Sequence, residues 1–197
     1  MCCRAIDSGE GNTGNATVSD STFWGNAAAG NEHLTGVDST VINGDGGAID
    51  NADNGGAGTV VVSASTFSGN VATHASGTVA NAGTLFVAGD ILKGSCSKSG
   101  GKWSDQAYNV AANATCLDAG TSDVSHGAGR LGPLASRGGP TKTMRPLASN
   151  PAVGLVPLNT TVTLNANPVT LCTTTDQRGV PSAVGKACNA GAVQSAP

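Results

Sequence analysis

A short pattern recurs along the first half of the chain, and such a repeat restricts the fold more than any other feature of this sequence. The stretch Val18–Asn26 (VSDSTFWGN) recurs as Val62–Asn70 (VSASTFSGN), and a weaker third copy is Val87–Ser95 (VAGDILKGS). The copies begin 44 and then 25 residues apart. A period of roughly 20–50 residues is typical of chains that stack one structural unit on the next. The longer offset fits one unit plus an insertion, or two short units.

Each copy has the alternation of a β-strand followed by a turn. In the second copy, alternation predicts one strand face made of Val62, Ala64 and Thr66. The opposite face would then carry Ser63, Ser65 and Phe67. The dipeptide Gly69-Asn70 predicts the turn, because both residue types tolerate left-handed backbone conformations. Asparagines stacked at equivalent turns can hydrogen-bond to one another from one unit to the next.

These features predict an all-β fold, a right-handed parallel β-helix in which each coil adds short strands to several sheets. Residues 14–95 are expected to form its rungs, with a looped-out segment between Ala27 and Gly44. Aromatic residues make up only 3% of the chain, which argues against a core of large side chains. A stack of parallel strands pairs its backbone groups between rungs and needs few large residues in each.

Charge and hydropathy exclude several other classes of protein. The net charge is −3 with abundant Val and Thr, whereas disordered chains have a high net charge and few β-branched residues. The ten Lys and Arg residues are scattered, so no basic surface for nucleic acid is expected. No apolar run approaches the roughly 20 residues that span a bilayer, and no signal peptide is recognisable. We expect residues 1–13 to be an irregular segment from the interior of a longer protein.

Six cysteines fall into three pairs along the sequence. Short spacing typical of metal ligands is absent from the sequence, so disulfides between Cys96 and Cys116 and between Cys172 and Cys188 are the preferred interpretation. Such bridges imply an oxidising compartment outside the cytoplasm. The role of the adjacent pair Cys2 and Cys3 stays open.

Two sets of motifs resemble known families. Gly46-Gly47-Ala48-Ile49, together with Phe23-Trp24-Gly25-Asn26 and Phe67-Ser68-Gly69-Asn70, resembles the GGAI and FxxN repeats of polymorphic outer-membrane proteins. Residues 96–197 resemble the C-terminal part of choice-of-anchor Q domain proteins. The matching blocks are Tyr108-Asn109-Val110, Leu131-Gly132-Pro133-Leu134, Gly138-Gly139-Pro140-Thr141, Asn150-Pro151-Ala152-Val153 and Asp176-Gln177-Arg178-Gly179, with Cys116, Cys172 and Cys188.

The second resemblance implies final rungs, a cap stapled by disulfides and a surface location, but it implies no chemistry. Two positions depart from the pattern of that family. Gly154 stands where the family has Asp, and Gly191-Ala192-Val193-Gln194 replaces its closing Gly-Ala-Phe-Glu. The chain ends at Pro197 without a recognisable sorting signal, so the means of anchoring stays open.

Candidate sites have structural explanations that compete with functional ones. Asp45, Asp50 and Asp53 could supply oxygen ligands to calcium, but a Gly/Asn/Asp-rich stretch is more often a solvated turn. We expect surface or turn roles for the histidines, which are His33, His74 and His126. In the Asp176-Gln177-Arg178-Gly179 block, we expect Arg178 to donate to backbone carbonyls and Asp176 to pair with it or cap a turn. We therefore assign no catalytic, cofactor-binding or metal-binding residue and expect no cofactor.

The sequence thus predicts a non-enzymatic, bacterial cell-surface or secreted protein with an adhesin-like role or a structural role in the envelope. Its expected partners are glycans or proteins of a host surface or of the cell envelope, and its oligomeric state stays open. The alternative is the C-terminal part of a carbohydrate-active β-helix enzyme, either a polysaccharide lyase or a glycoside hydrolase. Several carboxylates stacked with Lys or Arg on one exposed sheet would favour the enzyme.

Overall fold

A computed structural model of the chain describes residues 5–8, 14–29, 46–51, 57–74, 76–118 and 120–194. Strands dominate these residues, and the single helical element among them is the short 3-10 helix η1 (Ala114–Cys116). No helix in the described ranges has the length and apolarity needed to cross a membrane.

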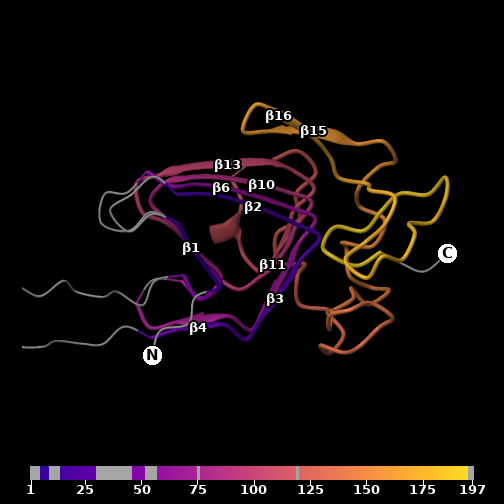
Figure 1. Cartoon of the computed structure of the whole chain (residues 1–197), viewed down its shortest axis with the longest axis horizontal. Helices are drawn as coiled ribbons and strands as arrows, with labels where there is room; N and C mark the ends of the chain where they lie inside the picture. Colours follow the sequence, from indigo (N-terminus) through magenta and orange to yellow (C-terminus); the bar gives the residue numbers. More distant parts are fainter. Residues whose placement is uncertain are drawn as a thin grey trace, which may run out of the picture.

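The chain passes through three parallel four-stranded sheets in the same order four times (Figure 1). The first sheet contains β1 (Ile6–Ser8), β5 (Ile49–Asn51), β9 (Val79–Asn81) and β12 (Cys96–Lys98). The second contains β2 (Asn15–Ser19), β6 (Thr59–Ser63), β10 (Thr84–Ala88) and β13 (Lys102–Ala107). The third contains β3 (Thr22–Trp24), β7 (Thr66–Ser68), β11 (Ile91–Lys93) and β14 (Val110–Ala111). We call one passage through the three sheets a repeat. Two short strands, β4 (Ala27–Ala28) and β8 (Val71–Ala72), also pair in parallel.

Strand register confirms the alignment of the three sequence copies. Val18 pairs with Val62, and Val62 pairs with Val87 in the second sheet. In the third sheet, Thr66 lies between Thr22 and Ile91. The sheets continue beyond residue 95, where the sequence pattern fades, because β12, β13 and β14 add a fourth repeat. Of the predicted looped-out segment, residues 27–28 form β4, and residues 30–45 lie outside the described ranges.

The predicted faces of the second copy are wrong, because that copy is two strands rather than one. Ala64 has a left-handed φ of 48°, which turns the chain between β6 and β7. The turn resets the alternation, so Val62 and Phe67 both point into the same buried core. This core runs along the inside of the three sheets. Phe67 stacks there on Phe23 of the preceding repeat, with ring centroids 4.7 Å apart and an interplanar angle of 2°.

Residues after β14 close one end of the core and then cover an outer face of the sheets. Cys116 of η1 is fully buried in the central core and is joined to Cys96 by a disulfide. The later part of the chain, orange to yellow in Figure 1, lies beside the stacked strands and includes the hairpin of β15 (Thr161–Leu164) and β16 (Asn167–Thr170). We call residues 125–194 the flanking segment. Its buried side chains form a second core with outward-facing residues of the sheets, including Val61, Ile91 and Val110.

Both predicted disulfides are present, since Cys172 is bonded to Cys188 within the flanking segment. The chain is therefore all-β with parallel sheets, an arrangement compatible with the predicted β-helix. In the hairpin of the flanking segment, β15 has alternating exposure and buries Leu164.

Candidate functional site

One corner of the fold concentrates the polar side chains that the sheets bury. Where the chain passes from the second sheet to the third, the second, third and fourth repeats each place a Ser, Asp or Asn side chain that accepts a hydrogen bond from the backbone of the preceding repeat. Asp123, which follows the fourth repeat, accepts the last bond of this kind. The four bonds are Ser21 N to Ser65 Oγ (3.2 Å), Ser65 N to Asp90 Oδ1 (2.7 Å), Asp90 N to Asn109 Oδ1 (2.9 Å) and Asn109 N to Asp123 Oδ1 (2.7 Å). We call this series the corner ladder.

The backbone explains why the ladder lies at this corner. The residue before each ladder side chain has a positive φ, and these residues are Asp20, Ala64, Gly89, Tyr108 and Ser122. A left-handed residue turns the chain sharply and leaves the next backbone N–H outside the regular strand pairing. A buried N–H of this kind needs an acceptor, which the side chain of the next repeat supplies.

Asp90 is the fully buried acid of the ladder, with an exposed fraction of 0%. Its carboxyl group accepts from the N–H groups of Ser65 and Ala88. Burial raises the pKa of Asp90 well above its ordinary value, and this outweighs the lowering by those two hydrogen bonds. The charges of Asp105 and Asp20 act in the same direction as burial.

At the last step of the ladder, two carboxyl groups lie against each other. Asp105 of β13 accepts from the side-chain amide of Asn109 (2.7 Å), whose backbone N–H donates to Asp123. Asp105 Oδ1 and Asp123 Oδ2 both lie beside Gly120, since a Cβ atom added there would be 2.5 Å from the first oxygen and 2.3 Å from the second. Burial is the largest cause that raises the pKa of Asp123 to about 7; the hydrogen bond and the charge of Asp105 also raise it, and the bonds from Asn109 oppose it. This pair is the strongest candidate for proton chemistry in the described part of the chain.

A second polar cluster fixes the end of the flanking segment. Asp176 accepts from the guanidinium of Arg178 (Nε to Oδ2, 2.9 Å) and from the backbone N–H groups of Arg178 and Gln194. Arg178 also donates to the carbonyl of Gln194 (2.9 Å). Burial opposes ionisation of Asp176, but the hydrogen bonds from Arg178 and Gln194 outweigh it and lower the pKa of this carboxyl. The predicted structural role of these two residues is confirmed.

The flanking segment is attached to the sheets beside this cluster. Gly191 N donates to Gly89 O at 2.7 Å, and Ala192 N donates to Thr66 Oγ1 at 3.0 Å. Thr22 of β3 donates to the side-chain oxygen of Gln177 at 2.6 Å. The outward threonines of the third sheet are therefore used for attachment.

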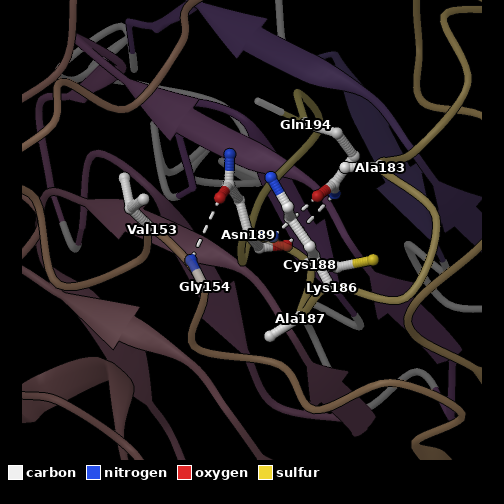
Figure 2. Close-up of a pocket in the computed structure, with 8 residues that line it drawn as sticks. All are labelled: Val153, Gly154, Ala183, Lys186, Ala187, Cys188, Asn189 and Gln194. Carbon is white, nitrogen blue, oxygen red and sulfur yellow. Dashed lines mark hydrogen bonds between the residues drawn. The ribbon is translucent and has the colours of Figure 1, made fainter. Parts of the chain in front are cut away.

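A small cavity of about 200 Å³ lies in the flanking segment (Figure 2). Two of its lining residues, Asn189 and Gln194, bond to each other through Asn189 N and Gln194 Oε1 (2.6 Å) and through Gln194 Nε2 and Asn189 O (3.1 Å). Asn189 Oδ1 also accepts from Gly154 N at 3.1 Å, as the dashed lines of Figure 2 show. These amides hold the wall of the cavity together, and we assign the cavity no ligand.

Of the three residues considered for calcium, only Asp50 lies in the described ranges. Asp50 is buried in β5, in register with Asp7 of β1, while Asp45 and Asp53 lie outside the described ranges. Among the described residues, no group of three or more His, Cys, Asp or Glu side chains is placed to hold a metal ion. His74 and His126 are exposed, and His33, Cys2 and Cys3 fall in ranges that are not described.

Sequence reasoning missed the corner ladder and the carboxyl pair, although part of the signal was present. Ser21, Ser65 and Asp90 occupy the same position in the three aligned copies. A polar residue at one position of every copy indicates a buried polar stack. Asn109 and Asp123 follow the point at which the copies stop aligning, so the pair had no signal in the repeat.

Comparisons with known proteins add no family to this geometry. A scan against family models, a search of curated proteins and a search of solved structures each found no match for the chain. The resemblances drawn from the sequence motifs therefore stay predictions.

Proposed function

We propose that the chain is a right-handed parallel β-helix belonging to an extracytoplasmic surface or secreted protein, with an adhesive role or a structural role in the envelope. Support for the fold comes from the fixed order in which four repeats visit the three sheets and from strands that stay in register between repeats. Such a stack presents long, regular outer faces, which suit binding to extended surfaces.

The proposed location is supported by the two disulfides. Cys96–Cys116 joins the fourth repeat to the helix that closes the core, and Cys172–Cys188 closes a loop of the flanking segment. Structural disulfides of this kind persist in oxidising environments and are rare in the cytoplasm.

The observation that carries a non-enzymatic role is the use made of the buried acids. Asp90 and Asp176, which are buried, and Asp123, which is partly buried, each accept hydrogen bonds from backbone N–H groups, and these bonds hold successive segments together. A catalytic acid or base must reach a substrate atom at hydrogen-bonding distance, which these backbone contacts hinder. The buried carboxyl groups are therefore better explained as parts of the stack.

The test of the location is a thiol titration of protein isolated from its native compartment, with and without denaturant, followed by peptide mapping. We expect the peptides that contain Cys96 and Cys116, and those that contain Cys172 and Cys188, to be linked. Free and reactive thiols at all four positions would overturn the extracytoplasmic assignment.

The test of the adhesive role is binding of the purified protein to an array of host and bacterial glycans. Protein with reduced and alkylated cysteines serves as the control. Binding that requires the folded, oxidised chain would support adhesion. Equal signals from both preparations would count against it.

A carbohydrate-active enzyme is the second candidate, and the Asp105–Asp123 pair is the observation that favours it. A pair in which one carboxyl group is protonated and the other ionised can supply an acid and a base to a glycosidic bond. Release of reducing ends or unsaturated products from a panel of polysaccharides, abolished in Asp123→Asn, would establish this activity. Absence of product at pH 4–8 would exclude it for these substrates.

A further inference from the structure

The segment after β14 is held on the fourth repeat by a few backbone hydrogen bonds. Tyr108 N donates to Thr121 O at 2.9 Å, and Val124 N donates to Asn109 O at 2.8 Å. Ala111 N donates to Val124 O at 2.9 Å. These contacts place residues 121–124 along the open edge of the last repeat. Detachment of this segment would therefore expose the edge of the fourth repeat, which is formed by β13 and β14.

The carboxyl pair joins this segment to the repeat beneath it. Asp105 belongs to β13, and Asp123 belongs to the segment. A Cβ atom added to Gly120 would lie 2.5 Å from Asp105 Oδ1 and 2.3 Å from Asp123 Oδ2, so both carboxyl groups face the same point of the backbone. Asp105 Oδ2 also accepts from Asp118 N at 2.8 Å, which ties the start of the segment to the same side chain.

A hydrogen bond between the two carboxyl groups needs a proton on one of them. Asp123 Oδ2 is buried and receives no hydrogen bond from an N–H or hydroxyl donor. Asn109 donates from its side-chain amide to Asp105 Oδ1 and from its backbone N–H to Asp123 Oδ1. With one carboxyl group protonated, the two acids can bond to each other. With both ionised, two negative charges face each other in a partly buried site.

We propose that Asp105 and Asp123 form a pH-operated latch, which holds residues 120–124 on the fourth repeat while the two carboxyl groups share a proton and loosens them when that proton leaves. The device would respond to a change in the pH around the protein. It concerns regulation of the fold and does not depend on the proposed surface role.

The charged groups around the pair do not replace the missing proton. Lys98 of β12 donates to Leu117 O at 2.6 Å and lies 4.0 Å from Asp118. Lys102 of β13 lies over the ring of Phe86, 5.6 Å from its centroid. The other titratable groups on the packed elements are Asp90 beneath the corner, with Tyr108 and His126 beside the segment. Ionised Asp90 would add negative charge and strengthen the effect.

The direction of the effect follows from the pKa of Asp123. Burial first, and the neighbouring Asp105 second, raise this pKa from 3.8 to about 7 in the folded protein. Asp123 therefore binds its proton more tightly when residues 120–124 lie on the fourth repeat than when they are detached. The stabilisation of the attached segment by this proton is fully present below about pH 4, is lost progressively as the pH rises to about 7, and changes no further above that. A single group changes such an equilibrium by at most about tenfold per pH unit.

Hydrogen exchange of the intact protein, with its disulfides formed, tests this latch. Protection factors corrected for intrinsic exchange are compared at pH 4.5 and 7.5. For amides of residues 120–124 we expect the protection factor to fall at least about tenfold between these two pH values. The fall should stay smaller than the limit of about tenfold per pH unit, because solvent reaches Asp123 and screens its interaction with Asp105. Amides of β6 in the middle of the stack serve as the internal control and should change less.

Two variants separate the latch from general loosening. In Asp123→Asn the side-chain amide can donate to Asp105 at any pH, so the fall in protection should disappear. Asp105→Asn should remove it in the same way and covers the case in which the first variant fails to fold. Protection of residues 120–124 that stays constant in the wild-type protein, or that falls equally in a folded variant, would overturn the proposal.

Discussion

The attachment of the flanking segment to the sheets gives the sharpest quantitative prediction, the effect of Gly191→Ala. Gly191 has a φ of +86°, and an added Cβ would lie 2.7 Å from Thr66 Oγ1 and 2.8 Å from Ile91 Cδ1. Its N–H also donates to Gly89 O. The substitution therefore combines a backbone penalty with a clash against two buried side chains of the third sheet.

The two costs can be separated by a matched control. Gly185 has a φ of +71°, but an added Cβ meets nothing within 4 Å. Gly185→Ala should therefore cost only the left-handed penalty, about 1–2 kcal/mol. Gly191→Ala should add an overpacking cost of about 1–3 kcal/mol. Its total effect on the free energy of unfolding is then about 2–5 kcal/mol.

Urea unfolding followed by circular dichroism measures both variants, and limited proteolysis reports whether the flanking segment detaches first. We expect Gly191→Ala to increase cleavage within residues 173–187 under conditions that leave the four repeats intact. Equal free-energy changes for the two variants would refute the inferred contact with Thr66 and Ile91.

Further predictions concern the core and the buried ion pair. Phe67→Ala removes a fully buried ring and should lower the free energy of unfolding by about 3–5 kcal/mol. Phe23→Ala, at the half-buried end of the same stack, should lower it less. The reverse order in urea unfolding would contradict the stacking argument. Arg178→Ala leaves the buried carboxylate of Asp176 without its cation and should cost about 3 kcal/mol at pH 7. Because the pKa of Asp176 is lowered in the folded protein, the contribution of its charge to stability is present above about pH 4 and is lost as the pH falls further. The difference in stability between the wild-type protein and Arg178→Ala should therefore shrink at pH 3. A difference that is constant with pH would contradict this.

Much of the repeat architecture could be predicted from the sequence because the copies are explicit. The pairs Val18–Val62 and Val62–Val87 were predicted by alignment alone. The stacked turn asparagines were also predicted, and Asn26 Nδ2 donates to Asn70 Oδ1 at 2.9 Å. Each of these features repeats a residue type at one position of the unit, which a single sequence displays.

The turn at Ala64 was missed because alanine rarely adopts a positive φ, although Asp20 and Gly89, at the same position of the other two copies, are residue types that tolerate it. Because this turn was missed, the predicted direction of the Phe67 side chain was also wrong. A second stack, in which Asn51 Nδ2 donates to Asn81 Oδ1 at 2.6 Å, had a signal that was overlooked. Both asparagines come two residues after Ile49 or Val79, the paired residues of β5 and β9.

The site near the flanking segment was beyond local patterns for a different reason. Ala192 N bonds to Thr66 across 126 residues of sequence, and Thr22 bonds to Gln177 across 155. No periodicity relates such positions, since each contact occurs once. The carboxyl pair has the same origin, because Asp123 reaches the ladder only after the chain has turned back over the fourth repeat.

The corner ladder has a direction, and this direction bears on how the chain is made. At each step the donating N–H belongs to the earlier repeat and the acceptor to the later one, from Ser21 through Ser65 and Asp90 to Asn109. As the chain emerges from the ribosome, each new repeat therefore completes the hydrogen bonds of the one before it. Asp123 closes the series by supplying the last acceptor. A partly made chain that ends between two repeats always has one corner N–H without an acceptor. Pairing with the next repeat in the sequence supplies that acceptor, which favours the addition of repeats in order.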